Sequence, residues 1–296
     1  MQQYHIPVLV AEVLEYLVPV SRDQEHRTYV DATFGGGGHT QAILEADPQA
    51  SVIAFDWDAD ALELNKQRLE ELFPGRIQFV WGNFAQLEHH LKKLRVTEVH
   101  GILADFGTSQ YQIKAQEGFS FMVNSPLDMR MSPGHYRVTA AGLLNSLSEK
   151  ELTELLWEYG QERHAREIAR AIVFTRRRKP LRMTSDLVDV VLSVVPRTKP
   201  GIHPATQTFQ ALRIVVNHEL ENIRSFLTQA IRVLRHDGHL VCISFHSLED
   251  RLVKQFFQDH KTELTNLTKH VVIASDTERS ANSSSRSAKL RAAARN

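Results

Sequence analysis

Side chains able to bind ligands or move protons follow several short apolar segments of this chain. Asp56, Asp105 and His246 each end a run of β-branched and other apolar residues, and Asp31 follows another such run. Carboxylates and imidazoles accept hydrogen bonds, hold cationic groups and take up protons. If the apolar runs are parallel strands, their carboxyl ends meet at one edge of a sheet, where ligands bind. The sequence therefore predicts a site built from these residues.

Asp31 also opens a segment that contains four successive glycines, residues 35–38, and ends at His39. Glycine adopts positive φ and has no β-carbon that would hold a ligand away from the backbone. A helix expected to begin near Thr40 adds N–H groups that have no partner within the helix. The segment predicts a loop that binds an anionic or closely apposed ligand, with a flexible surface loop as the alternative.

The segments around these residues alternate between strand and helix patterns. Short runs rich in β-branched and aromatic residues predict strands, and apolar residues three or four positions apart predict helices. The expected strands are residues 28–34, 51–56, 77–80 and 99–105, and the expected helices are residues 40–46 and 59–72. This alternation indicates an α/β fold, in which a mostly parallel sheet is covered by helices on both faces.

The alternation stops after Asp105 and resumes only with a strand predicted at residues 239–245. An interval of this length is too long for a single loop. Its patterns predict helices at residues 149–159, 163–174 and 185–195, and one long helix at residues 209–234 that should pack on the sheet again. We therefore expect a discontinuous main domain and an inserted helical subdomain, with boundaries at residues 1–109 and 206–296 for the first and 110–205 for the second.

The glycine-rich loop and Asp56 together indicate a cofactor that contains a nucleoside. Asp56 lies 18 positions after Gly38, where a carboxylate accepts hydrogen bonds from the hydroxyls of an adenosine ribose. NAD and S-adenosylmethionine both satisfy this pattern. S-adenosylmethionine is favoured because the loop lacks the plain G-x-G-x-x-G spacing and because Asp31 suits a ligand with an ammonium and a sulfonium group. Phe84, after the third strand, is either an adenine contact or a core residue.

Asp105 ends the fourth predicted strand and is the first candidate for a catalytic role. Methylation of a pyrimidine carbon usually needs a cysteine thiolate, whereas the single cysteine, Cys242, lies within an apolar strand and looks inert. Transfer to an exocyclic amine needs only an aligned nitrogen and an acceptor for its proton. Asp105 can supply that acceptor. His246 is a second candidate, and its alternative is a structural role with hydrogen bonds to the backbone.

The composition restricts the class of protein. Lys and Arg together number 35, as do Asp and Glu, so any contact with nucleic acid depends on local clusters of charge. One cysteine excludes an internal disulfide and a cysteine-rich zinc site, and the histidines show no metal-binding spacing, so we expect no metal. The chain has no apolar run long enough to cross a bilayer and no signal-type N-terminus, which predicts a soluble cytoplasmic protein without membrane contact.

A local cluster of positive charge lies between Arg163 and Arg182, where eight residues are basic and one, Glu167, is acidic. Such a cluster suits contacts with phosphates, and a solvated helix face is the alternative. Phe119, followed two residues later by Phe121, offers a ring on which an unpaired base could stack, unless both rings belong to the core. These features favour an RNA partner.

Long motifs over nearly the whole chain resemble one family, the bacterial N4-cytidine methyltransferases of small-subunit (16S) ribosomal RNA. These motifs are His5-Ile-Pro-Val-Leu, Asp31 to His39, Gly118-Phe-Ser-Phe, Pro126-Leu-Asp-Met-Arg-Met131, Tyr159-Gly160, His203-Pro-Ala-Thr, Thr208-Phe-Gln-Ala-Leu-Arg-Ile214 with Asn217 and Glu219-Leu220, and Ile243-Ser-Phe-His-Ser-Leu-Glu-Asp-Arg251. The resemblance implies a class I S-adenosylmethionine-dependent methyltransferase fold, Rossmann-like, with a helical insertion for substrate recognition. The implied reaction is methyl transfer to the N4 amine of a cytidine near the ribosomal decoding centre.

The resemblance also implies roles for individual residues. The implied cofactor contacts are Gly37, Gly38, His39, Asp56, Phe84, Asp105 and Gln112. The implied substrate contacts are Phe119, Arg130, Arg213 and Asn217, beside the catalytic candidates Asp105 and His246. The chain departs from the family pattern in the loop 106–112 and at residues 282–284, and neither departure touches the glycines or Asp56.

The expected partner is small-subunit ribosomal RNA within an assembled or assembling 30S subunit, and the sequence is compatible with both a monomer and a homodimer. Two other functions stay open at this point. An NAD-dependent oxidoreductase would need a hydride-accepting substrate pocket with a general acid. A non-catalytic RNA-binding ribosome assembly factor would keep the cofactor fold without transferring a methyl group.

Overall fold

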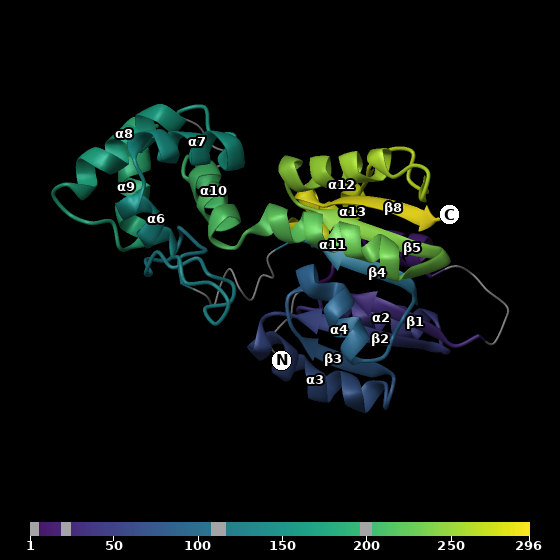
Figure 1. Ribbon diagram of the computed structural model, residues 1–296. Helices are drawn as coiled ribbons and strands as arrows, with labels where there is room; N and C mark the ends of the chain where they lie inside the picture. The colour runs from purple at the N-terminus through teal and green to yellow at the C-terminus, as the bar shows by residue number, and fades with distance from the viewer. Residues whose placement is uncertain (1–5, 19–24, 108–116, 196–202) are drawn as a thin grey trace. The chain divides into compact units, whose positions relative to one another are not determined.

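The computed structural model describes residues 6–18, 25–107, 117–195 and 203–296 (Figure 1). The chain divides into two compact units: a sheet unit, Met1–Ser109 with Leu220–Asn296, and a helical unit, Gln110–Glu219. Each unit has its own hydrophobic core. Within the described ranges, every helix is too short or too polar to span a bilayer.

The sheet unit is built on one eight-stranded sheet with the strand order β3-β2-β1-β4-β5-β8-β6, in which β7 also pairs with β8. Strands β1 to β5 pair in parallel, whereas β8 is antiparallel to β5, β6 and β7. The strands are β1 (Arg27–Asp31), β2 (Ala50–Asp56), β3 (Ile77–Trp81), β4 (Val99–Asp105), β5 (Leu234–Ser244), β6 (Leu264–Asn266), β7 (Val272–Ile273) and β8 (Lys289–Arg295). The predicted α/β fold with a mostly parallel sheet is therefore confirmed.

Helices flank this sheet. They are α1 (Val10–Leu17), α2 (Gly38–Ala46), α3 (Ala59–Leu72), α4 (Leu87–Lys93), α11 (Glu219–Val233), α12 (Ser247–Asp259) and α13 (Asp276–Ala281), with the short 3-10 helices η1 (Phe84–Gln86) and η2 (Ser283–Ser287). Apolar residues of α1, α2 and α3 share one core with inward residues of the central strands. Strands β2 and β4 are apolar and mostly buried along their length, as parallel strands covered on both faces must be.

The strand order contains one switch point. From β1 the chain builds β2 and β3 on one side, and then returns to place β4 and β5 on the other side. Crossover connections therefore run in opposite directions from the carboxyl ends of β1 and β4, which leaves a crevice that ligands occupy in open α/β sheets. Asp31 and Asp105 are the last residues of these two strands.

The helical unit contains α6 (Ala140–Ser146), α7 (Glu149–Gly160), α8 (Ala165–Arg176), α9 (Thr184–Val194) and α10 (Thr206–Val216). The core of this unit takes residues from all five helices. Helix α10 packs closely on α7 at Gly160, where a β-carbon would lie 2.6 Å from the carbonyl oxygen of Gln207.

Two expectations about this part of the chain need correction. The structure breaks the single helix predicted at residues 209–234 into α10 and α11, with His218 at φ 50° between them. The expected return to the main domain at residue 206 is replaced by a division between Glu219 and Leu220. The physical reason is that Phe209, Leu212 and Val216 of α10 belong to the helical core rather than packing on the sheet.

Candidate active site

Three aspartates end neighbouring strands at the carboxyl edge of the sheet. Asp31 ends β1, and the adjacent strands β2 and β4 end at Asp56 and Asp105. Asp31 is 1% exposed, Asp56 is 9% exposed, and the Asp105 side chain is 12% exposed. The structure thus brings three acidic groups predicted from the sequence to the switch point of the sheet, and it removes most water from them.

Two threonines that the sequence analysis missed hold this edge together. The Thr33 N–H donates to Asp31 Oδ1 at 3.2 Å, and the Thr33 hydroxyl oxygen accepts from the Asp105 N–H at 2.7 Å. The Thr40 hydroxyl donates to Asp31 Oδ2 at 2.7 Å. The Asp-Ala-Thr spacing was a usable signal, since an aspartate often accepts from the N–H two residues later.

Asp56 fixes the start of the glycine-rich loop. Its Oδ2 accepts from the Gly35 N–H at 2.7 Å, and its Oδ1 accepts from the Asp58 N–H at 2.9 Å. Each oxygen of a carboxylate has a second lone pair. Asp56 therefore orders the loop and keeps the capacity to accept hydrogen bonds from a ribose.

Gly37 and Gly38 leave room for neighbouring side chains of the protein, whereas the sequence suggested that they leave room for a ligand. At Gly37, where φ is 73°, a β-carbon would lie 2.5 Å from the Leu69 side chain and 2.8 Å from the Phe34 ring. At Gly38 it would lie 2.7 Å from the Pro7 ring. The space beside these α-carbons is filled by the protein's own side chains, so their role as cofactor contacts stays a prediction.

The carboxyl edge gathers desolvated acidic groups. Burial, with a smaller contribution from the neighbouring Asp31, raises the pKa of Asp56 to about 7 and the pKa of Asp105 to about 6. Burial also raises the pKa of Asp31 itself. His39 lies nearby, with its Nδ1 4.0 Å from Asp105 Oδ2, while its Nε2 lies 2.8 Å from the Val8 carbonyl oxygen.

This charge distribution fits S-adenosylmethionine. A cluster of desolvated carboxyl groups attracts a ligand that carries a sulfonium and an ammonium group, because opposite charges interact strongly where water is excluded. The same cluster repels the pyrophosphate of NAD. Asp31, Asp56 and Asp105 are therefore the residues best suited to hold the cofactor, and the cofactor choice made from the sequence agrees with the electrostatics of the edge.

Phe84 belongs to an aromatic cluster at the same end of the sheet unit. Its ring centroid lies 5.5 Å from that of Phe226, 6.0 Å from Phe106 and 6.2 Å from Trp57. The residue is only half-buried. Phe84 thus packs on other rings, as the core alternative requires, and retains exposed surface for an adenine contact. Gln112, the remaining implied cofactor contact, lies outside the described residues.

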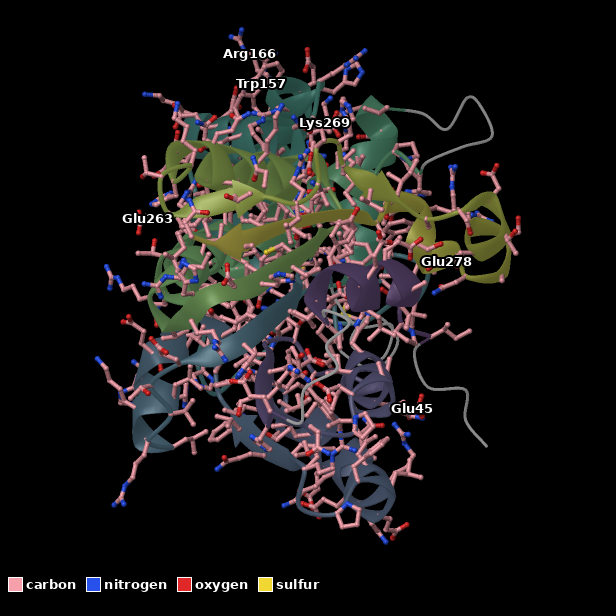
Figure 2. The ribbon with its side chains drawn as sticks, turned by 90° about the vertical axis from the view of Figure 1, so that its right-hand side faces the viewer. Glu45, Trp157, Arg166, Glu263, Lys269 and Glu278 are labelled. Carbon is pink, nitrogen blue, oxygen red and sulfur yellow. The ribbon has the colours of Figure 1, made fainter. Side chains whose placement is uncertain are left out.

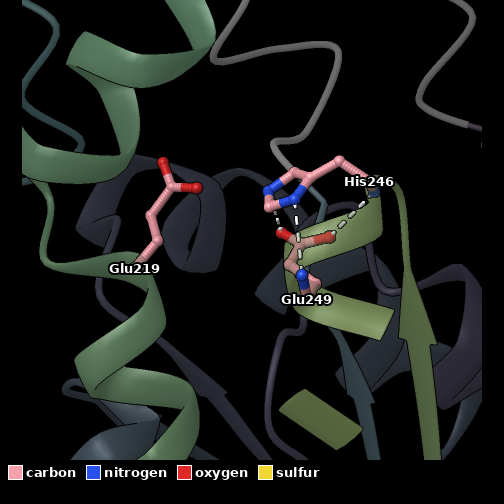
Figure 3. A group of neighbouring side chains, drawn as sticks. All are labelled: Glu219, His246 and Glu249. Atoms are coloured by element: carbon pink, nitrogen blue, oxygen red, sulfur yellow. Dashed lines mark hydrogen bonds and ion pairs between the residues drawn. The ribbon is translucent and has the colours of Figure 1, made fainter. Parts of the chain in front are cut away.

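His246 is the N-cap of α12 (Figure 3). Its Nδ1 accepts from the backbone N–H of Glu249 at 3.4 Å, and its Nε2 lies 3.1 Å from Glu249 Oε1 without the alignment of a hydrogen bond. Glu249 is 1% exposed, and its Oε2 accepts from the Phe245 N–H at 2.7 Å. Both ring nitrogens therefore face Glu249, which favours the structural alternative for His246.

Cys242 behaves as expected from the sequence. The residue is 0% exposed in the middle of β5, and burial strongly raises the pKa of its thiol. A buried thiol with a raised pKa is not a nucleophile at neutral pH. The sheet edge therefore offers carboxylates, and no thiolate, to a reacting pyrimidine.

The predicted substrate residues lie in the helical unit. Arg130 makes a bidentate ion pair with Asp128, with both N–O distances at 2.7 Å, and Arg213 pairs in the same way with Glu219 at 2.9 and 3.0 Å. Phe119 is half-buried. These contacts orient the two guanidinium groups, and their role as substrate contacts stays a prediction.

Asn217 holds a loop of the helical unit. The residue is 0% exposed, its Oδ1 accepts from the Met131 N–H at 2.7 Å, and its Nδ2 donates to the Met129 carbonyl at 2.7 Å. Met129 has a φ of 64°, a conformation that apolar residues rarely adopt. Asn217 therefore positions the loop that carries Arg130, a role that differs from the direct substrate contact implied by the family resemblance.

Comparison with known proteins assigns the family. Residues 2–296 match the model of the MraW methylase family. Proteins named ribosomal RNA small subunit methyltransferase H are 45% identical in Geobacter sulfurreducens, over 98% of this chain and 98% of the relative, and 43% identical in Methylobacterium nodulans, over 98% and 90%. Among solved structures, a putative rRNA methylase from Clostridium thermocellum has a TM-score of 0.47 at 10% identity, over 97% of this chain and 95% of that chain. On the strength of the sequence relatives, the chain belongs to the MraW methylase family and is a methyltransferase.

Proposed function

We propose that this protein transfers a methyl group from S-adenosylmethionine to the exocyclic N4 amine of a cytidine in small-subunit (16S) ribosomal RNA near the decoding centre. The observation that carries the proposal is the group of three aspartates, two of them buried and Asp105 nearly so, at the switch point of a methyltransferase sheet. The names of the relatives supply the class of substrate. The absence of an accessible cysteine favours an amine over a ring carbon as the acceptor.

Asp105 is the residue to which we assign the proton chemistry. Bound at this edge, S-adenosylmethionine supplies an activated methyl group. The amine nitrogen must lose a proton when it gains a methyl group, and an aligned acceptor lowers the barrier for that loss. Burial raises the pKa of Asp105 to about 6, so its carboxylate is a stronger base than an ordinary aspartate and is still ionised at neutral pH.

We assign recognition of the RNA to the helical unit and cofactor binding to the sheet unit. The substrate is the RNA within an assembled or assembling 30S subunit in the cytoplasm, bound by a monomer or a homodimer. The helical unit supports this division of labour because it carries the cluster of basic residues between Arg163 and Arg182, while the sheet edge is acidic. Neither an oxidoreductase nor a non-catalytic assembly factor finds support in the family assignment.

A transfer assay tests the proposal. The native protein is incubated with S-adenosylmethionine labelled in its methyl group and with small subunits, or naked 16S RNA, that lack the modification. We expect label in the RNA with the native protein and an initial rate of labelling at least 100-fold lower with Asp105→Asn. A native protein that binds the cofactor but labels neither substrate would refute the proposal. The ratio of label in subunits and in naked RNA identifies the form of the substrate.

A further inference from the structure

Helix α8 of the helical unit presents arginines and one aromatic ring along a single exposed face. Arg166, Arg170, Phe174 and Arg177 are spaced three or four residues apart and are exposed. At the helical rise per residue, the face is about 16 Å long from the first to the last of them. The opposite face is buried in the helical core, through Ala165, Ile168, Ala169 and Ile172.

Some basic residues of this region contact a partner within the protein, and others do not. Arg170 lies 3.6 Å from Glu149, Lys179 lies 2.7 Å from Asp186, the Arg176 guanidinium donates to the Leu144 carbonyl, and Arg178 covers the Phe174 ring. Among the described residues, the side chains of the other four have no ion pair or hydrogen bond: Arg163, Arg166, Arg177 and Arg182.

The helix dipole does not account for the two of these arginines at the start of α8. Arg163 precedes the N-cap His164 and Arg166 lies in the first turn, where the dipole disfavours positive charge. A polyanion would stabilise arginines at these positions. Phosphate groups do so, because neutralising them releases bound counterions.

Exposed aromatic rings accompany the free arginines. Trp157 is 65% exposed on the last turns of α7, and Phe174 is 57% exposed on α8. Figure 2 labels Trp157 and Arg166, whose side chains project from these two helices. The helices are neighbours, since Arg170 pairs with Glu149. A flat ring beside arginines is the arrangement on which unpaired bases stack.

We infer that this surface, the arginine face, binds nucleotides of the RNA substrate other than the reacting cytidine. It comprises the free arginines and the two exposed rings: Trp157, Arg163, Arg166, Phe174, Arg177 and Arg182. Its arginines contact phosphates, and unpaired bases stack on Trp157 and on the face of the Phe174 ring that Arg178 does not cover. The inference rests on the proposed function, whose acceptor site it supplements with a surface that contributes affinity and no chemistry.

The test is the salt dependence of binding to 16S RNA that lacks the modification. The triple variant Arg166→Gln, Arg177→Gln, Arg182→Gln removes three exposed charges. We expect KM for the RNA to rise by at least tenfold, while kcat and the Kd for S-adenosylmethionine stay unchanged. The slope of log Kd for RNA against log salt should fall by about 2 to 3, since each phosphate contact contributes about 0.7 to 0.9. Trp157→Ala should raise the Kd for RNA without changing this slope.

Two controls separate the arginine face from general effects. Lys92→Gln, Lys93→Gln, Lys261→Gln removes three exposed charges from the sheet unit, and it should leave the slope and KM close to their native values. The triple arginine-to-lysine variant keeps the charges and should keep most of the binding. Native KM and slope in the glutamine variant, or an equal loss in the sheet-unit control, would overturn the inference. Selective binding of an acidic protein in place of RNA would also overturn it. If the native protein methylates RNA in the same assay, the proposed function stands in each of these cases.

Discussion

At pH 8, replacing Asp56 with asparagine should raise the stability of the free protein and lower its affinity for the cofactor. Burial raises the pKa of Asp56 from 3.8 to about 7. The folded protein therefore keeps this proton between about pH 4 and pH 7, where the unfolded chain has lost it, and stability falls as the pH rises through that window. A shift of about three units at 1.36 kcal/mol per unit corresponds to about 4 kcal/mol at pH 8.

Asparagine carries no charge, so the variant does not lose unfolding free energy as the pH rises. It is destabilised in a different way, because its amide N–H must face the N–H of Gly35 or of Asp58, both of which donate to the native carboxylate. That clash costs about 1 to 3 kcal/mol at every pH. We therefore expect the unfolding free energy of Asp56→Asn, relative to the native protein, to rise by about 4 kcal/mol between pH 4 and pH 8. Denaturant unfolding without cofactor measures this difference.

The same substitution removes a charge-assisted hydrogen bond to the cofactor, worth about 1.5 to 3 kcal/mol. The Kd for S-adenosylmethionine, measured by calorimetric titration, should rise by about 10- to 100-fold. Asp60→Asn is the matched control, because Asp60 is an exposed aspartate of the neighbouring helix α3, and it should change both quantities little. A stability difference that does not vary with pH, together with native cofactor affinity, would refute the reasoning.

Three further predictions follow from the geometry. Asp105→Asn should lower kcat for methyl transfer at least 100-fold at saturating S-adenosylmethionine, and the Kd for S-adenosylmethionine should rise as well, since Asp105 is also one of the residues assigned to hold the cofactor. Transfer and titration assays on one preparation measure both quantities, and native kcat at saturating cofactor would contradict the assignment. In the native protein, kcat/KM should fall as the pH drops through about 6, because the raised pKa of Asp105 lets it take up a proton there; a flat profile from pH 5 to 8 argues against this base. Asn217→Ala should lower the unfolding free energy by about 2 to 4 kcal/mol, since it leaves the buried Met131 N–H and Met129 carbonyl without their partner. Denaturant unfolding measures this loss, and an unchanged midpoint and slope would contradict the prediction.

The sheet and its acidic edge were predictable from the sequence because the signal for each is local. Strands β2 and β4 are continuous apolar runs, and Asp56 and Asp105 mark their ends within the sequence itself. The alternation of strands and helices then places those ends on one edge, whatever the details of packing. The family resemblance, now confirmed, required only that the motifs occur in the right order.

Features set by distant contacts were not predictable. The apolar spacing continues in phase from α10 into α11, whereas the break between them occurs beside Asn217, whose hydrogen bonds reach residues 86 and 88 positions away. The need for glycine at Gly38 comes from Pro7, which is far from it in sequence. Sequence also could not show that both nitrogens of His246 face Glu249, because a histidine N-cap does not fit the usual Ser/Thr-x-x-Glu capping pattern.

The identity of the methylated nucleoside tests the central claim most directly. Small-subunit RNA that lacks the modification is treated with the native protein and S-adenosylmethionine, digested to nucleosides and analysed by mass spectrometry. An acidic edge that serves an exocyclic amine predicts N4-methylcytidine, formed at least 100-fold more slowly by Asp105→Asn. A methyl group on a ring carbon or on another base, or an unmodified digest from protein that holds the cofactor, would contradict the account.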